Sequence, residues 1–311
     1  MDRVEQQADG RLVGVDVGGT KVLAALVDDS GSVIRRARAA TPSREAPATE
    51  LESVIAAVVR ELVADDSPSA VGLAVAGFVD AAGECVRFAP HLALRDHPLR
   101  IRMEERLGVP VHLDNDANAA LEGERRFGAA VGADQAALVA LGTGIGAALL
   151  VGGRLVRGAG GMAGELGHVN VARDGRACPC GLTGCWEQYV SGRALQRAYA
   201  QRAGRDVPGP EVTALALDGD AAAIDAYAEM GRWLGLGLVG LVAAFDPSLL
   251  VIGGGVAAAG DLLLAPARKA LAAGVPGAAY RVMPDVAAAR LGTDAGVVGA
   301  ASAARDLLAQ I

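Results

Sequence analysis

Three cysteines and a histidine gather in one short stretch of the chain. His168 is followed by Cys178, Cys180 and Cys185, whereas Cys85 stands far from them. Thiolates plus one imidazole form a Cys₃His set, the donor set of a tetrahedral zinc site whose four positions are all filled by protein. We therefore expect a structural Zn²⁺ rather than one that activates water. The alternative interpretation is a group of unligated thiols.

Two carboxylates, Glu165 and Glu187, flank these ligands. A zinc ion would hold the loop 165–187, and with it Glu165, His168 and Glu187, in place against a substrate. Without the cysteines, Glu165 and His168 would be interpreted as an ordinary surface pair.

Three glycine clusters are candidates for binding a nucleotide, and the first has the residues of a phosphate site. Asp16 is followed by Gly18, Gly19, Thr20 and Lys21, and glycines let backbone N–H groups close on an anion. Asp16 could hold a hydrated Mg²⁺, which prefers one or two carboxylates together with phosphate oxygens. A plain hairpin turn is the alternative interpretation.

A second turn of the same kind strengthens the phosphate interpretation. It consists of Gly142, Thr143 and Gly144, and a third cluster, Gly253-Gly254-Gly255, would let a flat ligand such as adenosine approach closely. Neither a Walker A motif nor a G-x-G-x-x-G fingerprint occurs, which argues against P-loop and Rossmann sites.

A candidate general base lies in the segment Asn115-Asp116-Ala117-Asn118, where a strand is expected to meet a helix. A carboxylate at that point can accept a proton from a substrate hydroxyl during phosphoryl transfer. The alternative is that one of these residues only caps the helix.

The elements expected to position these residues form a repeat. Strands at 12–16 and 21–28 flank the first glycine turn, and strands at 136–141 and 145–151 flank the second. This pattern predicts an α/β protein with two related domains facing a shared cleft. Further strands are expected at 32–39, 70–76, 109–113 and 249–252, helices at 49–64, 101–107, 115–124, 192–202, 221–244 and 295–308, and a loop at 90–100.

Composition excludes other classes of protein. The 311 residues include 29 Lys+Arg and 36 Asp+Glu, a net charge of −7, which disfavours a nucleic-acid binder. A hydrophobic content of 52% excludes disorder. The opening MDRVEQQADG has no apolar core typical of a signal peptide, and the uncharged runs 233–245 and 247–260 fall short of the roughly 20 apolar residues of a membrane span. We expect a cytoplasmic protein with no membrane or nucleic-acid partner.

The motifs together resemble those of the ROK (repressor, open reading frame, kinase) family of sugar kinases, over about Val13 to Ala300. They are, in order, DVGGTK, NDANAA, GTGIG, GMAGELGH and CPCGLTGCWEQY. Within the family, the segment after Cys185 is most similar to that of bacterial ATP-dependent glucokinases. The resemblance implies phosphorylation of the 6-hydroxyl of a hexose, with glucose as the leading candidate, and a homodimer or homotetramer.

The resemblance also implies a fold. This is the two-lobed fold of the sugar kinase, actin and Hsp70 ATPase group, built from duplicated ribonuclease H-like domains with the active-site cleft between the lobes. The expected N-terminal lobe is 1–117, completed by the C-terminal helix 295–311. The expected C-terminal lobe is 118–294 and includes the zinc-bound loop 165–187.

Roles follow position by position from the resemblance. Asp116 would be the catalytic base. The sugar would be held by Gly77, Asn115, Asp116, Glu165, His168 and Glu187. ATP and its phosphates would be held by Asp16, Gly18, Gly19, Thr20, Lys21, Gly142, Thr143, Gly144 and Gly254, with Asp16 serving Mg²⁺. Zinc would be held by His168, Cys178, Cys180 and Cys185.

Departures from the family pattern leave alternatives open. His91 and Leu94 stand in a loop expected near the pocket rim where other residues are usual, so mannose, fructose, N-acetylglucosamine and N-acetylmannosamine remain candidate substrates. Polyphosphate could replace ATP as the phosphoryl donor. Binding polyphosphate would require a basic surface near the glycine turns, and this acidic chain has no obvious run of Lys or Arg. A sugar-sensing regulator is a remote alternative, because only about a dozen residues precede the first expected strand, too few for a DNA-binding domain.

Overall fold

The computed structural model describes residues 11–63 and 67–309. The expectation of no signal peptide rests on residues 1–10 and lies outside this range. By their internal contacts, the described residues divide into two compact units. The first comprises the residues up to Gly128, residues 157–163 and those from Asp294 onward, and the second comprises residues 129–156 and 164–293.

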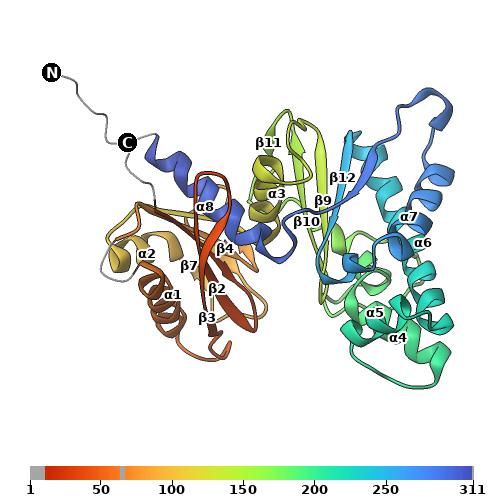
Figure 1. The fold of residues 1–311 in the computed structure, drawn as a ribbon, viewed down its shortest axis with the longest axis horizontal. Coiled ribbons are helices and arrows are strands. Elements are labelled where there is room, and N and C mark those ends of the chain that lie inside the picture. Colours follow the sequence, from red (N-terminus) through yellow and green to blue (C-terminus); the bar gives the residue numbers. More distant parts are fainter. Residues whose placement is uncertain (1–10, 64–66, 310–311) are drawn as a thin grey trace. The chain divides into compact units, whose positions relative to one another are not determined.

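The first unit is built on a five-stranded sheet in the order β3-β2-β1-β4-β8 (Figure 1). The strands are β1 (Leu12–Val17), β2 (Lys21–Val27), β3 (Val33–Ala40), β4 (Ala70–Val75) and β8 (Val111–Asn115). β1 pairs antiparallel with β2 and parallel with β4, and β4 pairs parallel with β8. The carboxyl ends of β1, β4 and β8 therefore lie at the same edge of the sheet, where Asp16, Gly77 and Asn115 are found.

Helices contact both faces of this sheet. Val13 and Val15 pack in one core with α1 (Ala48–Val63), whereas the intervening Gly14 faces α8 (Ala295–Leu308). A Cβ at Gly14 would lie 1.8 Å from the carbonyl oxygen of Val297, and one at Gly72 would lie 1.9 Å from that of Ala300. The glycines thus let the C-terminal helix, blue in Figure 1, lie directly on the red and orange N-terminal strands.

The first unit also contains two further helices and a small second sheet. They are α2 (Leu99–Leu107), α3 (Asp116–Phe127) and a small sheet of β5 (Phe78–Val79), β6 (Val86–Phe88) and β7 (Arg95–His97). α3 packs closely on α8, because Gly299 leaves no room for a Cβ beside the Ala119 carbonyl. The boundary expected after residue 117 would cut α3, which the contacts keep whole within the first unit.

The second unit repeats the sheet of the first, in the order β11-β10-β9-β12-β13. Its strands are β9 (Ala136–Leu141), β10 (Ile145–Val151), β11 (Arg154–Leu155), β12 (Leu249–Gly253) and β13 (Asp285–Ala288). β9 pairs antiparallel with β10 and parallel with β12, and β12 pairs parallel with β13. The order and directions match those of the first unit, so the repeat expected from the two glycine hairpins is confirmed at the level of whole sheets.

Helices α4 (Gly192–Ala203), α5 (Gly209–Leu217), α6 (Ala221–Phe245) and α7 (Asp261–Gly274) complete the second unit. Among the described residues, one helix, α6, is long and apolar enough to cross a membrane by length and composition alone. It exceeds the uncharged run 233–245 because it begins in a charged stretch. Tyr227, Leu234 and Leu238 are buried in the unit's core, which is typical of a core helix.

Most of the expected elements are present with small shifts of their ends, but several were missed. β7 lies within the stretch 90–100 that was expected to be a loop. α5 and α7 were not expected, because α5 is short and begins Gly-Pro, and α7 has Pro266 in its interior. β13 was missed because it is a four-residue edge strand without a fully buried side chain.

Candidate active site

The junction of β8 and α3 presents the candidate base. Asn115 is the N-cap of α3, since its Oδ1 accepts hydrogen bonds from the backbone N–H groups of Ala117 (2.9 Å) and Asn118 (3.3 Å). Its Nδ2 donates to the carbonyl oxygen of Gly77 (3.1 Å). The capping alternative therefore applies to Asn115, and Asp116 is the half-buried first residue of the helix.

Asp114, one residue before the cap, organises this junction. Its Oδ1 accepts from the Asn115 N–H (2.8 Å) and from Asn118 Nδ2 (2.9 Å), and its Oδ2 from Arg157 Nε (3.1 Å). Burial by itself raises the pKa of Asp114, but His112, Arg157 and Asn118 outweigh it and hold that pKa below the ordinary value. Arg157 was not identified from the sequence.

The first glycine turn is held from outside by one threonine. The Gly18 N–H donates to the Lys21 carbonyl (3.0 Å), which closes the β1–β2 hairpin. Thr41 Oγ1 donates to the Gly18 carbonyl (2.7 Å), and the Thr41 N–H donates to the Thr20 carbonyl (3.2 Å). With these carbonyls engaged, Gly19 and Thr20 stay exposed at the turn. Thr41 was not expected, because no local sequence signal connects it to residues 18–20.

Asp16 points to the same edge of the sheet. Burial raises its pKa, and Lys21 only partly offsets this. A cation would relieve the desolvated carboxylate, so the residue fits a Mg²⁺ ligand.

The structure corrects the expected place of the loop after Pro90. Leu94 is fully buried in the first unit's core rather than at a pocket rim. His91 is exposed and lies beside the first glycine turn, since a Cβ at Gly19 would lie 2.7 Å from His91 Cβ. Arg95, which the sequence did not indicate, fixes this loop through donations from Nη1 to the carbonyls of Ala89 (2.5 Å) and Leu92 (3.0 Å).

The second unit carries the second glycine turn. The Gly142 N–H donates to the Gly144 carbonyl (3.0 Å), and the Gly142 carbonyl accepts from the Gly192 N–H at the start of α4 (2.8 Å). Thr143 is exposed. Gly254 has φ +81°, and a Cβ there would lie 2.3 Å from the Leu141 carbonyl oxygen. The third glycine cluster therefore packs directly on the strand that leads into this turn.

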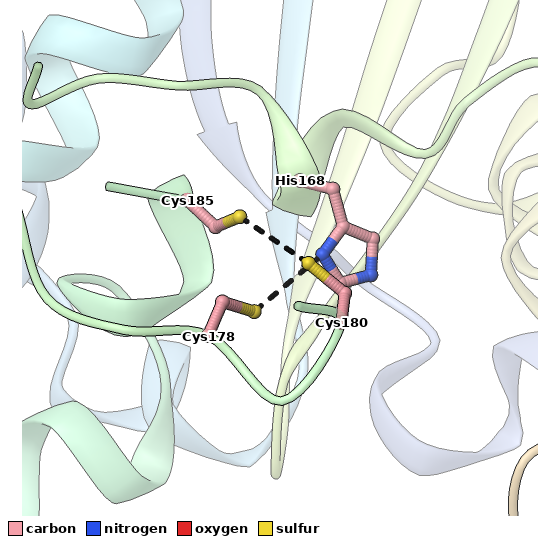
Figure 2. A group of neighbouring side chains, drawn as sticks. All are labelled: His168, Cys178, Cys180 and Cys185. Atoms are coloured by element: carbon pink, nitrogen blue, oxygen red, sulfur yellow. Dashed lines mark hydrogen bonds between the residues drawn. The ribbon is translucent and has the colours of Figure 1, made fainter. Parts of the chain in front are cut away.

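The four expected zinc ligands meet in one cluster (Figure 2). The donor atoms of His168, Cys178, Cys180 and Cys185 all lie within 4.8 Å of one another. The two sulfurs of Cys180 and Cys185 are 3.6 Å apart, and Cys178 Sγ is 3.8 Å from His168 Nδ1. Donor atoms about 2.3 Å from a tetrahedral zinc are separated by similar distances, so the set fits the ion.

The electrostatics of the four-residue cluster favour a cation. Burial and the sulfurs of Cys180 and Cys178 raise the pKa of Cys185 to about 12. Three thiolates so close together need a compensating positive charge, which a bound metal supplies.

The sugar-ligand candidates of the second unit lie around this cluster. His168 directs Nδ1 to Cys178, and its Nε2 is 4.0 Å from Glu165 Oε2. Glu187 Oε1 accepts from Cys178 Sγ (3.4 Å), and its Oε2 lies 2.6 Å from where a Gly144 Cβ would be. Burial raises the pKa of Glu165, with a further increase from the charge of Glu187.

The core of the second unit anchors the cluster. Trp186 follows the last cysteine, is buried, and donates from Nε1 to the Trp233 carbonyl of α6 (2.9 Å). Gly237 makes room for its ring, since a Cβ there would lie 2.0 Å from Trp186 Cε2.

The repeated sheets, the paired glycine turns and the carboxylates beside a Cys₃His cluster define a sugar kinase of the two-lobed actin and Hsp70 ATPase class. A profile of the ROK family matches residues 12–307, and the chain belongs to this family.

Known glucokinases and hexokinases are similar to this chain over nearly its full length. A glucokinase of Streptomyces coelicolor is 40% identical over 96% of this chain and 98% of its own. A crystal structure of a ROK family glucokinase from Streptomyces griseus, in complex with glucose and AMPPNP, has a TM-score of 0.87 and 41% identity, covering 96% of this chain and 100% of that one. A ROK hexokinase from Thermus thermophilus has a TM-score of 0.79 and 35% identity, covering 97% and 100%.

Proposed function

We propose that this protein is an ATP-dependent glucokinase, which transfers the γ-phosphoryl group of ATP to the 6-hydroxyl of D-glucose. The observation that carries the proposal is the 41% identity to the Streptomyces griseus glucokinase over nearly all of both chains. The first-turn carboxylate of Asp116 and the clustered His168, Glu165 and Glu187 supply the side chains that this reaction needs.

In the proposed reaction, Asp116 accepts the proton of the sugar 6-hydroxyl. The sugar oxygen then forms a bond to the γ-phosphorus while the bond from that phosphorus to the bridging β-oxygen breaks, which gives ADP and glucose 6-phosphate. Amides of the turns at Gly18–Thr20 and Gly142–Gly144 would hold phosphate oxygens, and Gly254 would border the adenosine. Mg²⁺ bound near Asp16 would neutralise the phosphate charge.

We propose that residues of each unit bind the sugar. Asn115 and the Gly77 backbone would bind sugar hydroxyls in the first. Glu165, His168 and Glu187 would do so in the second. A metal held by His168 Nδ1 would fix the tautomer with hydrogen on Nε2, so this nitrogen would donate to a sugar oxygen. Bound by four protein ligands, the zinc would be structural, and we propose a cytoplasmic homodimer or homotetramer.

A coupled assay tests the proposal. Glucose, mannose, fructose, N-acetylglucosamine and N-acetylmannosamine are each supplied with ATP and with polyphosphate, and product formation is followed. We expect the highest kcat/KM with glucose and ATP. A higher value for another sugar or for polyphosphate would reassign the substrate, and no ADP release with any hexose would contradict a kinase.

The role of Asp116 is tested by Asp116→Asn. Because general-base catalysis contributes about 10²–10⁴-fold, kcat should fall by about that factor while glucose binding persists. Glu105→Gln is the matched control, since it removes an exposed carboxylate of the first unit that pairs with Arg102 at the surface. Unchanged turnover in Asp116→Asn would remove the residue from the base role.

A further inference from the structure

Arg157 lies in a short segment, 157–163, that belongs to the first unit although its sequence neighbours on both sides belong to the second. Its guanidinium contacts Asp114 Oδ2 through Nε (3.1 Å) and through Nη2. The Asp114 side chain is only 6% exposed, whereas that of Arg157 is 34% exposed. The arginine therefore supplies a counter-charge to a nearly buried carboxylate from the solvent side.

The backbone holds Arg157 in this position. The Ala163 N–H donates to the Arg157 carbonyl (3.1 Å), which closes the segment on itself. Gly161 has φ +81°, and a Cβ there would lie 2.0 Å from the Val79 carbonyl oxygen. The segment is thus packed against the backbone that follows β5.

We propose that Arg157 is a positioning residue for Asp116: it holds Asp114 against the start of α3 and so fixes the helix turn that carries the base. This proposal rests on the proposed function. The chain of contacts runs from Arg157 to Asp114, from Asp114 Oδ1 to the Asn115 N–H and Asn118 Nδ2, and from the Asn115 cap to the first turn of the helix.

Removal of the guanidinium would leave this network without its charge balance. Burial alone raises the pKa of Asp114, and Arg157 is one of the groups that reverse this effect. Without it, the carboxyl group takes up a proton or turns toward water. If it turns, the Asn115 N–H and the Asn118 amide lose the acceptor that sets their geometry, and if it is protonated, they keep only a weaker, neutral acceptor.

The first test is Arg157→Met, assayed for kcat and KM with glucose and ATP. Misplacement of a catalytic group by about 1 Å costs on the order of 10²-fold in rate, so we expect kcat to fall by about 10- to 100-fold with the KM for glucose nearly unchanged. Arg157→Lys should recover part of the rate, because it keeps the charge without the planar two-nitrogen contact. Arg125→Met is the matched control, since it breaks an ion pair with Glu122 at the other end of the same helix.

A double-mutant cycle completes the test. If Arg157 acts through Asp114, then Arg157→Met should lower kcat little further in an Asp114→Asn background. Independent, multiplicative losses would overturn the proposal, as would an Arg157→Met enzyme with wild-type kcat and a lower Tm. If the wild type is active and Arg157→Met has the same kcat, only the positioning role is overturned. If the wild type phosphorylates no hexose, the proposed function itself is overturned.

Discussion

Two aspartates on one face of the first sheet are in opposite electrostatic situations. Asp16 pairs across β1 and β4 with Ala74, and Ala74 pairs with Asp114 on β8. Arg157 and its neighbours lower the pKa of Asp114, whereas burial raises that of Asp16. Asp114 is compensated by the protein and suits a structural task. Asp16 is not fully compensated and suits a cation that arrives with substrate.

Asp16→Asn should stabilise the ligand-free protein and inactivate it. When folding raises the pKa of a carboxyl group, the folded protein becomes less stable as the pH rises from the unfolded-state pKa through the folded-state pKa. At pH 7 the wild type therefore carries an unfavourable buried charge that asparagine lacks. We expect a higher Tm at pH 7, by about 2–4 °C for each kcal/mol relieved, and a kcat lower by about 10²-fold.

The pH dependence distinguishes this cause from a packing effect. The Tm difference should shrink as the pH falls toward and below the ordinary carboxyl value of 3.8, where the wild-type group is also neutral. A Tm difference that is the same at pH 4 and pH 8 would contradict the assignment. Calorimetry of both proteins across this range, without ATP or Mg²⁺, provides the measurement.

At the residue scale, the sequence predicted the groups that meet a ligand better than those that support them. The clustering of His168, Cys178, Cys180 and Cys185 was predictable because local spacing brings the donors together. Thr41, Arg95 and Arg157 were not, because each acts through a contact that only the folded chain creates. Leu94 was misplaced for the same reason, since its burial depends on packing against other elements.

At the element scale, glycines decide how closely backbones approach. Gly254→Ala should destabilise the second unit, because the residue has φ +81° and its Cβ would overlap the Leu141 carbonyl. Strain of this kind costs about 1–3 kcal/mol, to which the overlap adds. We expect a lower Tm and a higher KM for ATP. Gly255→Ala is the control, because its Cβ would meet nothing within 4 Å.

The zinc loop is a second element with a testable role. Elemental analysis should find about one zinc per chain, and removal by a chelator or by Cys185→Ser should raise the KM for glucose by about tenfold, because the folding of this loop is coupled to the metal. Cys85→Ser should retain both zinc and affinity. Protein purified without zinc, or an unchanged KM after its removal, would contradict the role of the loop.

Elements that are strongly periodic or flanked by glycine turns were predictable from the sequence, whereas short edge elements were not. The hairpins of β1–β2 and β9–β10 were recognisable because buried alternating strands meet at glycines. α7 carries an internal proline that usually ends a helix, and its packing on α6 overrides that preference.

At the scale of the whole molecule, two sheets of the same topology carry different chemistry. The first unit supplies Asp16 and Asp116, and the second supplies the Cys₃His cluster with Glu165 and Glu187. Duplication therefore accounts for the two glycine turns, while the proposed base and the Cys₃His cluster are features of one copy each.

This division predicts how glucose changes the stability of variants. A ligand that binds only the folded state stabilises it by about 2.7 kcal/mol at 100 times its Kd, so saturating D-glucose should raise the Tm of the wild type. The shift should persist in Asp116→Asn, where only proton acceptance is lost, and decrease in Glu187→Gln, where a proposed sugar ligand is weakened. L-Glucose is the matched control, because its composition is identical and its hydroxyl geometry is mirrored. An equal shift with both enantiomers would show that the effect is not binding at this site, and a shift that vanished in Asp116→Asn alone would make Asp116 a binding residue first and a base second.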